Sequence, residues 1–229
     1  MSGYSPALSI LTAVFEFAAA GLAFRSNGRK RILYPTGVLF LLLAGYQVAE
    51  VAVCARPQQL LFSQLAFFII TWLPPVGLWL TAQLISPRMK WLRAVSFIYC
   101  AAALALTIWI FIDPSCITKS VCQVVIASYG HSSLFHSVYG IFYQSGLALM
   151  VFTASAGMTL TADIIIRKHL ANVQTGVLGF VLPSLLLRII MSEPKGVLPS
   201  VMCHLALILA LSLLALVLRE GKCRGLPSP

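Results

Sequence analysis

The sequence predicts an all-α membrane protein, and the observations behind this prediction are the composition and the lengths of the apolar runs. Of its 229 residues, 59% are apolar and only 10% are charged, with a mean hydropathy of +0.93. Soluble domains carry about 25% charged residues, so this composition favours lipid over water. Apolar runs of about 20 residues cross a bilayer as helices. We expect a single domain, residues 1–229, with seven transmembrane helices over residues 6–24, 32–54, 60–84, 91–113, 138–165, 173–191 and 197–218.

Local features qualify individual spans. Pro74 and Pro75 lie in the middle of the third span and should kink it, because proline removes a backbone donor and clashes with the preceding turn. The fifth span is long enough to tilt or to begin as an interfacial segment. The longest connection, residues 113–137, contains the stretch "VCQVVIASY", which we interpret as a short helix or strand on the membrane surface. No basic region precedes the first apolar run, so we expect that run to remain as a span.

The basic residues predict the orientation of the spans. Cytoplasmic loops of membrane proteins carry an excess of Lys and Arg. With seven spans, twelve of the sixteen basic residues fall on the side of the C-terminus and four on the other. We therefore expect the N-terminus outside and the C-terminal tail in the cytoplasm, with the net charge of +10 serving topology and anionic head groups rather than nucleic acid. The twelve are Arg25, Arg29, Lys30, Arg31, Arg88, Lys90, Arg93, Arg167, Lys168, Arg219, Lys222 and Arg224, and the four are Arg56, Lys119, Arg188 and Lys195.

The cysteines favour one disulfide on the outer side. Cys116 and Cys122 share the outer loop and are close enough in sequence to form a small ring. An oxidising exterior favours a disulfide between them. Cys54, at the outer end of the second span, is a competing partner for either residue.

One face of the second span is polar. Gln47, Glu50 and Cys54 are spaced i, i+3, i+7, and Tyr46 lies one turn before Glu50. Residues at this spacing share one face of a helix. Intramembrane ionisable residues normally face the bundle interior or a wet cavity, because lipid leaves them unpaired. We expect this polar stripe to face protein or water.

Further polar residues near the outer ends of the spans can meet this stripe. We predict an outward-facing polar pocket in which Glu50 is the anionic element. A simpler alternative stays open: Glu50 forms a structural ion pair, for example with Arg188, and the histidines are neutral packing or solvated loop residues. The spacing of His131 and His136 indicates no metal site, and we assign neither catalytic nor metal-binding residues. The residues predicted to bind a ligand are Tyr46, Gln47, Glu50, His131, His136, Tyr143, Arg188 and His204.

Three other ionisable residues have less specific interpretations. Glu16 lies near the middle of the first span, which makes it the deepest acid and a candidate for a buried hydrogen bond. Asp163 and His169 flank the inner end of the fifth span, where we interpret them as head-group residues. No lysine lies in the middle of the last span, and the chain has no zinc-protease, nucleophile-elbow or phosphate-loop motif.

Four short segments, "YQVAE", "WLPPVGLWL", "YGHSS" and "SVMCHLALILALS", resemble an uncharacterised bacterial family of multispan membrane proteins, a domain of unknown function. The resemblance covers most of the chain. It implies that Gln47, Glu50, Trp72, Pro74 and His131 are the family positions. This sequence departs from the family pattern at Leu73, which separates the tryptophan from the proline. The resemblance also implies a bacterial inner-membrane location and assigns no activity. More generally, seven spans with an outer N-terminus resemble the membrane sensor segments of some bacterial histidine kinases.

These observations favour a non-enzymatic membrane protein that binds a small ligand or lipid, or that serves as a subunit of a larger membrane assembly. Its expected partners are the bilayer and, beyond it, other membrane subunits or a small ligand. One alternative is a membrane-embedded hydrolase, with a metal held by His131, His136 or His204 and with Glu50 as general base. Another alternative is a small transporter, and the only feature that favours it is the Pro74–Pro75 break. The sequence identifies no cofactor.

Overall fold

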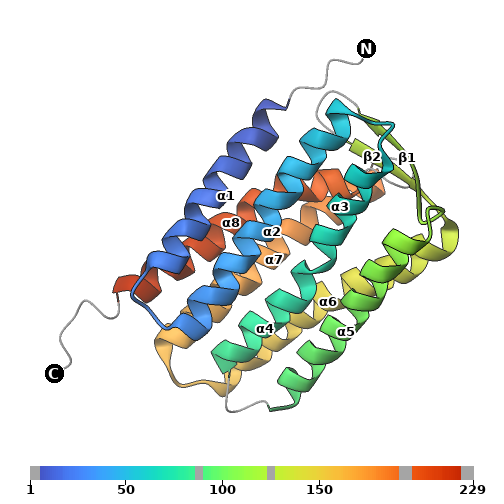
Figure 1. Ribbon diagram of the computed structural model, residues 1–229. Helices are drawn as coiled ribbons and strands as arrows, with labels where there is room; N and C mark the ends of the chain where they lie inside the picture. Colours follow the sequence, from blue (N-terminus) through green and yellow to red (C-terminus); the bar gives the residue numbers. More distant parts are fainter. Residues whose placement is uncertain (1–5, 86–89, 123–126, 191–197, 223–229) are drawn as a thin grey trace.

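The computed structural model describes residues 6–85, 90–122, 127–190 and 198–222. These residues are almost entirely helical, as predicted, and their long helices pack side by side in one bundle (Figure 1). Five helices are long and apolar enough to cross a membrane, among the residues described: Ala7–Arg25, Lys30–Ala55, Leu60–Ile85, Trp91–Ile112 and Ser133–Leu160. The helices are α1 (Ala7–Arg25), α2 (Lys30–Ala55), α3 (Leu60–Thr71), α4 (Leu73–Ile85), α5 (Lys90–Ile112), α6 (Ser133–Leu160), α7 (Ile164–Ile190) and α8 (Leu198–Lys222).

The third apolar run is broken where the prolines predict it. Helix α3 ends at Thr71 and α4 begins at Leu73, and the axis changes direction between them (Figure 1). Pro74 and Pro75 have no N–H to continue the hydrogen bonds of α3. The backbone N–H of Trp72 turns back to the carbonyl of Ile69 at 3.3 Å, which tightens the last turn of α3.

The boundaries of the fifth and sixth runs differ from the prediction because two polar residues cap the helices. Helix α6 begins at Ser133, where the Oγ of Ser132 accepts a hydrogen bond from the backbone N–H of Phe135. Helix α7 begins at Ile164, where the Oδ1 of Asp163 accepts from the N–H of Ile165 at 2.8 Å. Such caps satisfy donors at the start of a helix. The predicted fifth span, 138–165, is therefore displaced, and Asp163 starts the next helix rather than ending the fifth.

Among the described residues, the exception to the helical fold is a β-hairpin in the connection between α5 and α6. Strands β1 (Ile117–Cys122) and β2 (Ala127–His131) pair antiparallel, so the strand interpretation is confirmed for the described residues of "VCQVVIASY", while residues 123–126 lie outside them. The hairpin lies across one end of the bundle and contacts α2, α3 and α8 (Figure 1). We call this the hairpin end of the bundle, and the opposite end, where α1 joins α2, the basic end.

Close contacts between helices depend on small residues. Gly146 of α6 faces Pro74 of α4, and a Cβ atom at position 146 would lie 2.6 Å from the Cβ of Pro74. One turn further into α4, Gly77 faces Met150 of α6 in the same manner. Glycine lets the two helices approach more closely than any other residue would allow. The α4–α6 contact thereby brings the middle of α6 to the break in the third run.

Candidate functional site

The polar stripe of α2 is buried in the protein. Tyr46, Gln47 and Glu50 are at most 1% exposed, whereas Val48 on the opposite side of the helix is 50% exposed. The expectation that the stripe faces protein rather than lipid is therefore confirmed. The stripe is buried because placing amide, hydroxyl and carboxyl groups against hydrocarbon is costly.

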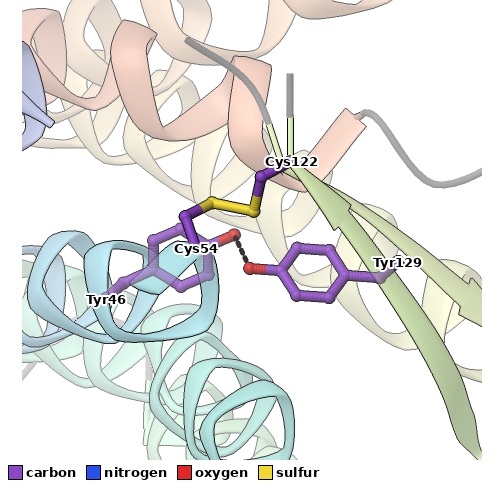
Figure 2. The surroundings of a disulfide bond; sticks show 4 residues. All are labelled: Tyr46, Cys54, Cys122 and Tyr129. Carbon is purple, nitrogen blue, oxygen red and sulfur yellow. Dashed lines mark hydrogen bonds between the residues drawn. A yellow bond between two sulfur atoms is a disulfide. The ribbon is translucent and has the colours of Figure 1, made fainter. Parts of the chain in front are cut away.

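The hairpin covers the end of this stripe. The hydroxyl of Tyr46 donates a hydrogen bond to the hydroxyl of Tyr129 in β2, at 3.5 Å. A disulfide between Cys54, at the end of α2, and Cys122, at the end of β1, ties the hairpin to the helix, with 5.6 Å between the two Cα atoms. Figure 2 shows the disulfide and the tyrosine pair side by side, linking α2 to the hairpin.

The predicted disulfide between Cys116 and Cys122 is wrong in this fold, and the competing partner Cys54 replaces Cys116. Cys116 precedes β1 and Cys122 ends it. Six residues of strand separate Cα atoms by about 20 Å, whereas a disulfide needs about 4.4–6.8 Å. Cys116 is instead a buried free thiol whose Sγ lies 3.8 Å from the carbonyl oxygen of Trp109.

An aromatic cluster connects the hairpin to α3 and α6. Its centre is Phe67 of α3, whose ring meets Tyr129 and Tyr139 edge-on, each at 5.3 Å between centroids. Such edge-to-face pairs add to the stability that burial of the rings provides. Tyr139 in turn stacks on Tyr143 at 6.0 Å, which carries the cluster one turn deeper along α6. We define the aromatic cluster as Phe67, Tyr129, Phe135, Tyr139 and Tyr143.

An apolar cavity lies below the aromatic cluster. Tyr143 belongs to both, and it is the cavity's one lining residue with a polar side-chain atom. Leu73, the first residue after the helix break, also lines the cavity. Phenol groups and buried polar side chains therefore lie above an apolar region whose cavity is small, about the size of one water molecule. The lining residues come from α2, α4, α6, α7 and α8: Leu39, Leu73, Leu80, Tyr143, Leu147, Met150, Val173, Val177, Phe180, Leu209 and Leu213.

The structure brings some of the other predicted site residues to the hairpin end. His136 is half-buried in the first turn of α6, where its backbone N–H donates to the carbonyl of Ser132. His131 ends β2 opposite Ile117, and Arg188 and His204 belong to α7 and α8. The side chains of these last three residues lie outside what the structure describes. Within the described residues, no three His, Cys, Asp or Glu side chains gather closely enough to hold a metal ion.

A polar cluster at the basic end was missed by the sequence analysis. Glu220 of α8 accepts hydrogen bonds from the Nε and Nη2 of Arg29, at 2.6 and 2.9 Å, and from the backbone N–H of the same residue at 3.0 Å. The Nε2 of His169 in α7 lies 2.9 Å from Oε2 of Glu220, the oxygen that also accepts from the Nη2 of Arg29. The interpretation of His169 as a head-group residue is wrong, because its side chain is completely buried.

The electrostatics of this basic-end cluster follow from its hydrogen bonds. Burial by itself raises the pKa of Glu220, but the hydrogen bonds from Arg29 and His169 outweigh burial and hold the pKa well below its usual range. The space around the carboxylate is tight, since a Cβ atom at Gly28 would lie 2.5 Å from the Cγ of Glu220. In the sequence, this cluster is signalled only by Glu220, an acid among basic residues after the last apolar run. That signal does not identify the partners of Glu220.

No protein-family model and no curated protein sequence matches this chain.

Proposed function

We propose that this chain is a seven-span bacterial inner-membrane protein, without enzymatic activity of its own, that binds an amphipathic small molecule or lipid from the outer side. The polar head of the ligand would meet Tyr46, Gln47 and Glu50 beneath the hairpin, and its apolar part would widen the small cavity by displacing the side chains that line it. The N-terminus would lie outside and the C-terminus in the cytoplasm.

Two independent features support this orientation. The Cys54–Cys122 disulfide lies at the hairpin end, and disulfides persist in oxidising compartments outside the cytoplasm. The opposite end carries exposed basic side chains, as cytoplasmic surfaces of membrane proteins do. These exposed basic residues are Arg25, Lys30, Arg31, Arg167, Lys168, Arg219 and Lys222.

The observation that carries the ligand proposal is the shared position of Tyr143. Its ring stacks on Tyr139 in the aromatic cluster and also lines the apolar cavity. Ligand sites are mostly apolar, with a few polar groups that set the orientation of the ligand. An amphipathic molecule matches this order of surfaces, with its hydrogen-bonding group towards the hairpin and its hydrocarbon towards Leu147 and Val177.

Photo-crosslinking tests the binding site. The probe is a fatty acid with a diazirine near the end of its tail, added to the protein in lipid nanodiscs. We expect crosslinked peptides from the cavity walls of α6, α7 and α8, and fewer of them in a Val177→Phe variant that fills the cavity. Leu104→Phe is the matched control, because Leu104 is 52% exposed on α5. Crosslinks confined to exposed faces and unchanged by Val177→Phe would remove the proposal.

The same probe tests the head-group site. Glu50→Gln keeps the size of the side chain and removes its charge, so we expect weaker crosslinking at the cavity, with the melting temperature measured on the same sample to confirm that the variant is folded. Equal crosslinking in this variant would reduce Glu50 to a packing residue. Separately, reporter fusions test the orientation: alkaline phosphatase at the C-terminus should be inactive and green fluorescent protein there should fluoresce. The opposite pattern would contradict the topology.

A further inference from the structure

A carboxylic acid is buried in the middle of α1, and no described residue hydrogen-bonds to either of its oxygens. Glu16 is completely buried, and within the described residues neither of its side-chain oxygens has a hydrogen-bond partner. Polar groups buried away from water normally have a partner, and an isolated charge in such a place is especially costly. Acids inside membrane spans are rare and mark ligand sites or proton pathways. Glu16 therefore requires an explanation that packing alone does not supply.

Glu16 is the inner end of a buried polar stripe on α1. Ser9, Thr12 and Glu16 are spaced i, i+3, i+7, and the two hydroxyl residues are 2% and 5% exposed. Because all three are buried, they lie on the packed side of α1. The helices that contact α1 are α2 and α8, which run beside it (Figure 1). At 1.5 Å per residue, Glu16 lies about 10 Å deeper than Ser9. The stripe thus runs from the hairpin end of α1 to its middle.

The surroundings of Glu16 follow from the pairing of the helices. Helix α2 runs antiparallel to α1, and the ring of Phe24 meets Tyr34 and faces Gly37. Glu16 is two turns before Phe24 on α1. It therefore lies at the level of residues 42–45, which are about two turns after Tyr34 and Gly37 on α2. Helix α8 runs parallel to α1, and the contact of Gly28 with Glu220 places residues 206–210 at the same level. Both segments are uncharged, "LLAG" and "ALILA", so neither offers a counter-ion.

The titratable groups nearest to this level lie towards the hairpin end. On α2 they are Tyr46 and Glu50, one to two turns outward, and on α8 the next is His204. On α1 itself no other titratable residue precedes Arg25 within the helix. A bound proton would neutralise the carboxylate without requiring a counter-ion or further ligands at this level.

We propose that Glu16 is a proton-binding site inside the membrane, and that the hydroxyls of Ser9 and Thr12 form its route to the outer side. A proton from outer water adds to one carboxylate oxygen and gives the neutral acid, and it leaves by the same route. Hydroxyl groups serve such a route because each can accept a proton on its oxygen and donate another. The inference is independent of any ligand bound beneath the hairpin.

Infrared spectroscopy of the protein in phosphatidylcholine nanodiscs tests the proton site. The difference between wild type and Glu16→Gln should contain the carbonyl band of a protonated carboxylic acid, and this band should shift when D₂O replaces water. Glu16→Asp should retain a shifting acid band, which keeps the test valid if the glutamine variant fails to fold. The proposal would be overturned if the differences of wild type from Glu16→Gln and from Glu16→Asp both lacked an acid band. A band that does not shift in D₂O would also overturn it.

The route is tested by a matched pair of variants at Thr12. Thr12→Ser keeps the hydroxyl and Thr12→Val keeps the shape without it. We expect the D₂O shift of the Glu16 band to occur at the wild-type rate in Thr12→Ser and several-fold more slowly in Thr12→Val. Equal rates in the two variants would exclude Thr12 from the route and overturn that part of the proposal.

Discussion

Arg29 and Glu220 are 191 residues apart in sequence and joined by three hydrogen bonds at the basic end of the bundle. The side chain of Glu220 is 3% exposed and that of Arg29 is 26% exposed, so the pair is largely shielded from solvent. Because His169 bonds to the same carboxylate, one acid connects α8 to α7 and to the turn between α1 and α2. The pair closes the bundle at the end opposite the disulfide.

Removing the charge of Glu220 should destabilise the protein. In Glu220→Gln, Arg29 and the buried His169 lose their anionic partner, and loss of one partner of a buried ion pair costs up to about 3–5 kcal/mol. Because Arg29 is partly exposed, we expect about 1–3 kcal/mol, measured as a lower melting temperature in nanodiscs. Asp163→Asn is the matched control, since asparagine also caps a helix. Equal melting temperatures for wild type and Glu220→Gln would contradict the role of the pair.

The contribution of Glu220 should disappear in acid. Its pKa in the folded protein is lowered from its ordinary value of 4.5, so the folded state gains stability wherever the carboxylate is charged. That gain is complete above about pH 4.5 and declines as the pH falls below this value. We expect the melting-temperature difference between wild type and Glu220→Gln to be constant near neutrality and to shrink progressively below pH 4.5. A difference that grows in acid would mean that the sign of the shift is wrong.

The disulfide assignment predicts a specific peptide map. Digestion without reductant should yield the peptides of Cys54 and Cys122 joined, and reduction should separate them. The loop between them closes 68 residues, so cleavage of the bond should lower stability by about 2–4 kcal/mol. Cys54→Ser and Cys122→Ser should have the same effect on the melting temperature, because either removes the same bond. A Cys116–Cys122 peptide would contradict the hairpin register.

Cys116 should react slowly in the folded protein. Burial raises the pKa of its thiol to about 11, and the neighbouring Asp113 carboxylate contributes. Because the thiolate is the reactive form, a rise from 9.0 to about 11 lowers its fraction at pH 8 by about a hundredfold. We expect slow alkylation by iodoacetamide, accelerated when the pH is raised or the protein is denatured. Asp113→Asn should accelerate alkylation of the folded protein, and alkylation at the rate of an exposed thiol would show that Cys116 is not buried.

Two glycines of α6 provide a packing test. Gly146→Ala places a Cβ atom 2.6 Å from the Cβ of Pro74, which belongs to a rigid ring, so the α4–α6 contact must widen. Overpacking of this kind costs about 1–3 kcal/mol. Gly140→Ala meets nothing within 4 Å and should be neutral or slightly stabilising, because alanine favours the helix. Melting temperatures of the two variants in the same lipid check this contrast, and equal values would indicate that α4 and α6 are further apart.

Local sequence features predicted the parts of the fold that depend on neighbouring residues. Apolar run length located the helices, and the prolines after Trp72 located the break, because hydrophobic burial and a missing N–H act within a few residues. The spacing of Gln47 and Glu50 predicted one buried face of α2 for the same reason. Ser132 and Asp163 belong to the residue types that cap helices, so the sequence did contain a signal for both helix starts. The apolar residues that follow each cap made the helix boundaries difficult to locate.

The partners of those residues were decided by tertiary structure. Cys122 pairs with Cys54 rather than Cys116 because an extended strand holds the nearer cysteine too far away, a fact that depends on the hairpin. His169 is buried because α8 brings Glu220 to it, and nothing near His169 in the sequence indicates this contact. The sequence alone thus determined which segments are helical, which are apolar and which face of α2 is polar. Which side chains meet across the bundle was decided only by the packing of distant helices, because those contacts depend on where the chain returns and not on the residues beside them.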